Sequence, residues 1–421
     1  MGSMPEPTRS GYRQLDIAII GSGLGGLSAA LALRRAGHNV TLYERYDFAG
    51  EVGASLSVAS NGSRWLLKWG LDVKAVKPVI LRNLIMHEWE TGAVKKEYGL
   101  GDYKARFGSE YYNFHRIDMH QVLLRTVQQA KGIGSPCRVL TKRKALGVNA
   151  KTGTIKFENG VTVTHDAIIA ADGIRSQTRH SIGIEPKVEP STSCCYRCII
   201  SADKLRELDL SEFITNDAIE FWGGFGIDKI VLSGCHNNEV VSCYCFYPAA
   251  HNGLDKDGWN IGATPDELCD TFPNLDPRVR KLFKNADDIK MWRLYIHEEY
   301  PYWVKNRVAL LGDAAHPMLP DQSQGFCMAI EDAAVLGELF KEGNFDGDVE
   351  QTLRYYEEIR KPRATRVQYA SAKARTNLDE RIGWSTGLER PGKLTIEEIC
   401  EYDLAGHVSS VVGSGVKQLS D

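Results

Sequence analysis

The sequence lacks any apolar run long enough to cross a bilayer. Its apolar stretches, such as 17–20 and 308–311, are far shorter than the ~20 residues of a transmembrane helix. An excess of one charge is also missing, since 51 Lys and Arg stand against 54 Asp and Glu. We therefore expect a small molecule as partner, and no nucleic acid and no membrane. Residues 1–12 lack the apolar core of a signal peptide, which predicts a cytoplasmic protein.

The ten cysteines do not show the spacing of a metal site. Cys195 and Cys198 lie in a strand-like stretch without turn glycines, and Cys243 and Cys245 alternate with aromatic residues as buried strand side chains do. We expect reduced thiols in the core and no metal.

The first recognisable pattern is a strand over 16–20, a helix over 27–36 and a second strand over 39–43. Between the first strand and the helix, Gly21, Gly23 and Gly26 follow the spacing G-x-G-x-x-G. In this setting the three glycines permit a tight turn, close approach of a diphosphate and close helix packing. The helix N-terminus adds unpaired N–H groups, so the sequence predicts a dinucleotide site.

An acidic residue, Glu44, ends the second strand, where a carboxylate can accept hydrogen bonds from a ribose diol. We place Glu44 and its neighbour Arg45 at the cofactor. This pattern alone leaves NAD and FAD as equal alternatives.

Two later strands also run into glycine and aspartate. One strand over 165–171 leads to Asp172 and Gly173, and another over 307–311 leads to Gly312 and Asp313. A helix over 326–340 begins after Gly325. Between these motifs, alternating β-like runs fill 189–292 and predict an inserted sheet. The charge run 360–363 is interpreted as a solvated helix face.

The three motifs in this order resemble the group A flavoprotein monooxygenases, the family of 4-hydroxybenzoate and salicylate hydroxylases. The segments 51–54, 112–118 and 355–363 are most similar to fungal salicylate hydroxylase-like enzymes, and the resemblance spans about 15–373. It implies an α/β fold with a Rossmann-like, glutathione-reductase-like FAD-binding domain, an inserted β-sheet substrate domain and a C-terminal helical tail. We expect the FAD-binding domain over 12–75, 113–188 and 290–375, the substrate domain over 76–112 and 189–289, and the C-terminal segment over 376–421.

The same resemblance implies bound FAD, with NADPH or NADH as a transient reductant. The expected reaction is hydroxylation of a phenolic or related aromatic by O2 through a flavin C4a-hydroperoxide, in secondary metabolism. An epoxidase of an alkene or indole, or a non-catalytic flavin redox sensor, would share these motifs. A monomer and a homodimer are both open.

Carried over residue by residue, Glu44 binds the adenosine ribose, Asp313 a ribityl hydroxyl, and Asp172 both FAD and the nicotinamide. The helix after Gly325 points its positive end at the flavin. The full set of expected cofactor residues is Gly21, Gly23, Gly26, Glu44, Arg45, Gly53, Ala54, Arg116, Asp172, Asp313, Gly325 and Phe326.

On the substrate side, Arg197 and Tyr196 are the expected catalytic residues, with Arg197 holding a substrate phenolate. A salt bridge inside the sheet is the alternative role of Arg197. Asp321 is either a substrate contact or an outward loop residue, and the loop is preferred. His115 and His316 are expected to support flavin-binding loops and not to act as bases. The aromatic residues of the inserted sheet suit either a pocket for a flat substrate or plain core: Trp222, Tyr244, Phe246 and Trp292.

Overall fold

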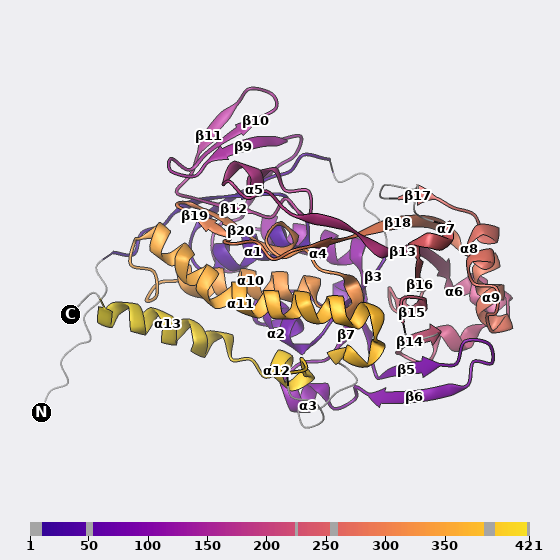
Figure 1. The fold of residues 1–421 in the computed structure, drawn as a ribbon. Coiled ribbons are helices and arrows are strands. Elements are labelled where there is room, and N and C mark those ends of the chain that lie inside the picture. The colour runs from indigo at the N-terminus through magenta and orange to yellow at the C-terminus, as the bar shows by residue number, and fades with distance from the viewer. Residues whose placement is uncertain (1–10, 48–53, 224–225, 253–259, 383–391, 419–421) are drawn as a thin grey trace, which may run out of the picture.

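The computed structural model describes residues 11–47, 54–223, 226–252, 260–382 and 392–418. Its first layer is a six-stranded sheet in the order β19-β20-β12-β1-β2-β8 (Figure 1). All neighbouring pairs are parallel except β19 with β20. The bounds are β1 Asp16–Ile20, β2 Asn39–Tyr43, β8 Arg138–Leu140, β12 Ala167–Ala170, β19 Val304–Lys305 and β20 Val308–Leu310. The central strands are almost wholly apolar because helices cover both faces of a parallel sheet.

The helices of this layer pack around α1 (Leu24–Arg35), which contacts both α4 and α10. Farther along the chain, α11 packs against α10, and α13 then packs against both. The remaining bounds are α2 Ser60–Lys68, α4 Arg116–Gln128, α5 Gln177–Ser181, α10 Gly325–Phe340, α11 Val349–Thr376, α12 Ile396–Cys400 and α13 Leu404–Gln418. The C-terminal helical tail is therefore confirmed.

The second layer is an eight-stranded sheet in the order β17-β18-β13-β16-β15-β14-β5-β6, on the right in Figure 1. The bounds are β5 Asn83–His87, β6 Val94–Gly99, β13 Val188–Ser201, β14 Ala218–Gly223, β15 Lys229–Cys235, β16 Val240–Pro248, β17 Ile261–Gly262 and β18 Asp287–His297. One face of this sheet packs on α6 (Ala202–Glu207), α8 (Pro265–Thr271) and α9 (Pro277–Lys284), and forms a separate core. The inserted sheet is confirmed, whereas β18 crosses the domain boundary that was expected at 289.

Two small sheets complete the fold. One joins β3 (Ser55–Val58), β4 (Val79–Ile80) and β7 (Tyr112–His115), and lies between the larger sheets. The other is the meander β9 (Ala145–Asn149), β10 (Thr154–Phe157) and β11 (Thr162–Thr164), at the top of Figure 1.

All ten cysteines are buried and free. Cys243 and Cys245 point into the helix-covered core of the eight-stranded sheet, as their alternation predicted. Among the described helices, none combines the length and the apolarity that a membrane span requires.

Candidate active site

The glycine loop after β1 has the three properties that its spacing predicts. Gly21 has a φ of +97°, and a Cβ there would lie 2.4 Å from the Ala171 carbonyl oxygen. A Cβ on Gly26 would lie 2.1 Å from the Gly21 carbonyl oxygen, so α1 can approach the loop only with glycine at this position. A Cβ on Gly23 would meet no atom of the described chain within 4 Å. Gly23 therefore borders space that a ligand can fill.

The N-terminus of α1 faces the same space. Its N-cap is Gly23, and no side chain among the described residues caps the helix. The Ser22 hydroxyl is also buried without a hydrogen-bond partner there. His120 Nε2 lies 2.8 Å from the Ser22 carbonyl oxygen and fixes the loop from α4. Free N–H groups at the positive end of a helix are suited to a diphosphate.

Glu44 stands directly beside this loop. The Ser22 N–H donates to Glu44 Oε2 at 2.8 Å, and the Tyr46 N–H donates to Oε1 at 2.9 Å. These two bonds hold the carboxylate at the mouth of the glycine turn, where the adenosine ribose is expected. Arg45 is exposed and lies over the Tyr46 ring.

The second and third motifs meet through one buried arginine. Arg179 on α5 donates to the carbonyl oxygens of Ile174 at 2.8 Å and Ala314 at 3.2 Å, and so joins the loop after β12 to the loop after β20. Asp172 Oδ2 accepts hydrogen bonds from the backbone and the hydroxyl of Thr178. Asp172 Oδ1 is buried with no partner among the described residues, which leaves it available to a ligand.

Asp313 is an exposed residue just after β20, and desolvation by the surrounding protein raises the pKa of its carboxyl above the ordinary value. The positive charges of His316 and Arg116 act in the opposite direction and lower that pKa. Arg116 begins α4, and its N–H donates to the Ala54 carbonyl oxygen at 2.9 Å. The structure therefore brings Arg116, Ala54 and Asp313 into one region, while Gly53 lies outside the described residues.

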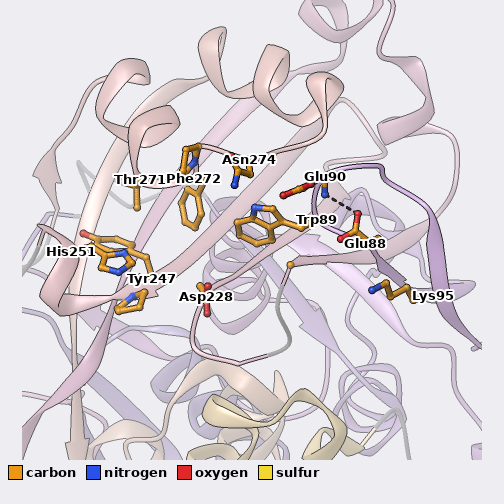
Figure 2. Close-up of a pocket in the computed structure, with 13 residues that line it drawn as sticks. Glu88, Trp89, Glu90, Lys95, Asp228, Tyr247, His251, Thr271, Phe272 and Asn274 are labelled. Atoms are coloured by element: carbon orange, nitrogen blue, oxygen red, sulfur yellow. Dashed lines mark hydrogen bonds between the residues drawn. The ribbon is translucent and has the colours of Figure 1, made fainter.

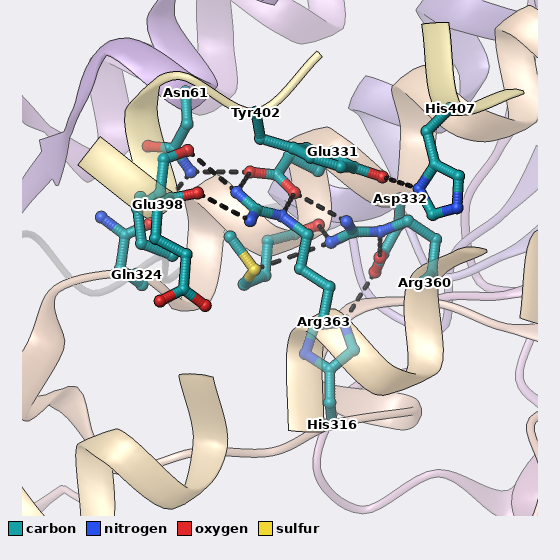
Figure 3. Close-up of polar contacts among 12 residues, drawn as sticks. Asn61, His316, Gln324, Glu331, Asp332, Arg360, Arg363, Glu398, Tyr402 and His407 are labelled. Atoms are coloured by element: carbon teal, nitrogen blue, oxygen red, sulfur yellow. Dashed lines mark hydrogen bonds and ion pairs between the residues drawn. The ribbon is translucent and has the colours of Figure 1, made fainter. Parts of the chain in front are cut away.

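A buried ionic network holds the loop after β20 in place (Figure 3). Asp332 Oδ2 accepts from the Gly312 N–H at 3.0 Å and lies 2.7 Å from His316 Nε2. Arg360 on α11 donates to Asp332 at 2.8 Å and to Glu331 at 2.6 Å. His316 thus supports the loop, and its expected lack of a base role stays a prediction.

The charge run 360–363 is consequently not a solvated face, and that interpretation was wrong. Arg360 has no exposed surface, and Arg363 donates to both oxygens of Glu331. Burial raises the pKa of Glu331, but the charges of Arg363 and Arg360 outweigh burial and hold the pKa at about 2. The acidic partners of this run, Glu331 and Asp332, lie on α10. The residue spacing within α11 alone could therefore not reveal these ion pairs.

The start of α10 offers a second uncapped helix N-terminus. Its N-cap is Gln324, and no described side chain caps the helix. Gly325 and Phe326 at its first turn are half-buried, and the Gln324 amide nitrogen is buried without a partner in the described chain. A group with developing negative charge would be stabilised there.

The sheet pairing separates the two expected catalytic residues. Arg197 lies on the face toward the six-stranded layer, whereas Tyr196 points into the helix-covered core and stacks on Tyr247 at 4.8 Å between centroids. Neighbours on a strand point to opposite faces, so Tyr196 lies away from Arg197 and we do not retain it as a site residue. Arg197 Nη2 lies 2.5 Å from Asp288. This ion pair corresponds to the alternative role of Arg197, a salt bridge inside the sheet.

The inner face of the sheet carries an apolar patch made by Cys195, Phe246, Leu294 and Leu319, with Val231 and Tyr244 packed against it. Leu319 belongs to the loop before α10, so this patch lies between the sheet and that loop. Tyr244 donates to the Ser55 carbonyl oxygen at 2.9 Å. Trp222, by contrast, belongs to the helix-covered core.

Asp321 is the clearest departure from expectation. Its side chain is fully buried, 2.8 Å from Lys229 Nζ and 2.6 Å from Arg375 Nη2. The preferred interpretation of an outward loop residue was wrong. Lys229 and Arg375 were missed by sequence reasoning, although a lysine at the start of the apolar run 229–232 was a usable signal.

Another pocket lies away from these residues. It measures about 450 Å³ and is bordered by Trp89, Tyr247 and Phe272, with Glu88 and Asp228 at its rim (Figure 2). None of the predicted site residues lines it.

The groups around the glycine loop suit FAD. Within the described residues, two helix N-termini without a side-chain cap, the fixed Glu44 carboxylate, the unpartnered Asp172 oxygen and the exposed Asp313 carboxyl provide donors and acceptors for a diphosphate, a ribose and a polyol chain. The chain matches the FAD binding domain family over residues 14–371 and belongs to that family.

Within it, the chain is an FAD-dependent aromatic monooxygenase. Hispidin-3-hydroxylase of Neonothopanus nambi is 33% identical and the match covers 93% of this chain and 94% of that protein. 3-Hydroxybenzoate 6-hydroxylase of Polaromonas naphthalenivorans is 28% identical over 89% of this chain and 90% of that protein. A salicylate hydroxylase substrate complex has the same fold, with a TM-score of 0.72, 23% identity, and coverage of 94% and 98%.

Proposed function

We propose that this monooxygenase uses NAD(P)H and O2 to hydroxylate a small phenolic aromatic that lies on the apolar patch. The observation that carries the proposal is the meeting of three motifs around one uncapped glycine loop, with the apolar patch on the facing sheet. Bound FAD supplies the oxygen chemistry. The chain orients the two ring systems and excludes water.

We assign Glu44 to the adenosine ribose, Arg116 and Asp313 to the ribityl–diphosphate chain, and Asp172 to the cofactor edge. Their shared surroundings support this assignment, since Arg116 acts electrostatically on Asp313 and Arg179 links the two loops. The N-terminus of α10 would stabilise negative charge on the flavin.

The proposal is tested with purified protein in two steps. A visible flavin spectrum is recorded first, and NAD(P)H oxidation is then followed with salicylates, resorcinols and indoles. Turnover stimulated by a phenol, with a product that has gained one oxygen atom, is the expected result. Bound flavin with no stimulation by any phenol contradicts it, and epoxidation of an indole would show the alternative reaction.

We also propose that the protein works in the cytosol as a monomer or homodimer. Ten buried free thiols support a reducing compartment. Light scattering of the holoenzyme measures the assembly, and a stable tetramer would contradict it.

A further inference from the structure

A group of buried charges lies beside the apolar patch. Lys229 comes from β15, Asp321 from the loop before α10, and Arg375 from the end of α11. Arg381 follows closely, and its Nη2 donates to Ser323 at 3.0 Å. Lys229, Arg375 and Arg381, which we call the cationic cluster, are each only 2% exposed.

Within the described residues, the cationic cluster has fewer carboxylate partners than cations. Among the described residues, Asp321 is the one carboxylate within ion-pair distance of Lys229 and Arg375, and no carboxylate pairs with Arg381. The neighbouring Asp228 is exposed. Lys229 Nζ also reaches carbonyl oxygens of the chain at 3.3–3.4 Å, which solvate its charge without cancelling it. Buried cations without a counter-ion are costly, so this arrangement favours an incoming anion.

Unused donors lie at the same place. Arg375 Nε and Nη1, and Arg381 Nε, are buried and have no acceptor in the described part of the chain. Arg375 Cζ lies 4.5 Å from the ring centroid of Phe246, and Lys229 Nζ lies 5.6 Å from the same centroid. Phe246 is a member of the apolar patch. The open N–H groups therefore adjoin the buried apolar side chains of this patch.

We propose that Lys229 and Arg375 bind an anionic oxygen of the substrate, a carboxylate or an ionised phenol, while its ring lies on the apolar patch. Asp321 is the internal counter-ion that holds the two cations in the ligand-free protein. This inference rests on the proposed function for the identity of the ligand as a substrate. The site would therefore accept anionic aromatics and exclude neutral molecules of the same shape. When a neutral molecule binds, the Arg375 guanidinium and the Lys229 ammonium lose their solvation without gaining a charged partner.

The test is a binding titration of the holoenzyme with hydroxybenzoates and the matching hydroxybenzamides, followed by the change in flavin absorbance. We expect at least one acid to bind tenfold or more tightly than its amide. Lys229→Met and Arg375→Met should each weaken binding of that acid at least tenfold and leave the amide within about twofold. Equal binding of acid and amide, no binding of any acid, or unchanged acid affinity in both variants overturns the proposal.

Further variants separate binding from folding. Lys229→Arg keeps the charge and should keep most of the acid affinity. Asp321→Asn removes the internal counter-ion and should leave acid affinity equal or higher, whereas loss of acid binding in a folded Asp321→Asn variant contradicts the proposal. Lys187→Met, at a side chain that is 77% exposed, is the matched control and should change nothing.

Two readouts separate this inference from the proposed function. The titration needs no turnover, so its result for the anion site remains valid even if no ligand stimulates NAD(P)H oxidation. Conversely, hydroxylation of neutral aromatics with no preference for acids would support the function and overturn the anion site.

Discussion

At the scale of single residues, substitutions in the glycine loop distinguish effects on cofactor binding from effects on folding. Gly23→Ala should leave the stability of the apoprotein unchanged, since its Cβ meets no atom of the described chain within 4 Å and its φ of −70° suits alanine. It should weaken FAD binding at least tenfold, because the methyl group enters the space of the diphosphate. Fluorescence titration with FAD and thermal unfolding of the apoprotein measure the two effects.

Gly26→Ala provides the matched comparison. Its Cβ would lie 2.1 Å from the Gly21 carbonyl oxygen, so α1 must move away from β1. We expect a loss of about 1–3 kcal/mol in the free energy of unfolding, as for an overpacked core. An apoprotein that unfolds like the wild type would show that α1 does not pack as described.

Asp313→Ala should lower the FAD content of the purified protein. The Asp313 carboxyl is expected to accept a hydrogen bond from a ribityl hydroxyl, and alanine removes the acceptor. We expect the ratio of flavin to protein absorbance to fall at least several-fold, while Asp203→Ala, at an exposed pair with Arg206, leaves it unchanged. Full yellow colour in Asp313→Ala would refute this role.

Residue positions were predictable from sequence where a backbone motif dictates them. The glycine spacing and Glu44 are local, and the structure brings Glu44 to the glycine turn, while their roles toward the cofactor stay predictions. Lys229, Asp321 and Arg375 lie far apart in the chain and meet only in the folded protein, so no local pattern defines their partners. Tyr196 and Arg197 show a related limit, because the pattern of one strand does not say which face looks toward the cofactor.

At the scale of secondary-structure elements, α10, α11 and the loop after β20 depend on Arg360. Arg360→Met leaves Glu331 and Asp332 buried with less compensation, which should cost about 3–5 kcal/mol of unfolding free energy at pH 7. Urea unfolding measures this cost. Arg354→Met is the control, because Arg354 is exposed on the same helix and contacts only Gln351 in the described chain.

The pH dependence of this variant has a definite sign. The folded pKa of Glu331 is about 2, below the ~4.3 of an unfolded glutamate. The ion pairs therefore stabilise the protein above about pH 4.3, and this contribution is lost as the pH falls toward 2. In Arg360→Met the Glu331 pKa rises, so the difference from the wild type should shrink as the pH falls through this raised pKa toward 2. A constant difference would contradict the ionic explanation.

The strands and helices that sequence analysis named individually were predicted to within a few residues because their apolar periodicity is strong, as in β1, β2 and α10. The meander β9–β11 was not predicted, since its short strands are largely exposed and show little alternation.

At the scale of the whole molecule, FAD should stabilise the fold, because three distant segments of the chain form its site. FAD at 100 times its Kd should add ~2.7 kcal/mol and raise the Tm by a few degrees. Riboflavin, which lacks the diphosphate and adenosine, should give a much smaller shift. Equal shifts for the two compounds would contradict the diphosphate site at α1.

The parallel sheet also has a consequence for synthesis of the protein. β1 pairs with β12, β12 pairs with β20, and α10 covers α1. The first β-α-β unit therefore leaves the ribosome with an apolar flank that its partner can cover only about 300 residues later. At 5–20 residues per second, this interval lasts roughly 15–60 s. Nascent chains of this protein should therefore depend on chaperones, and slower, cooler expression should favour soluble product.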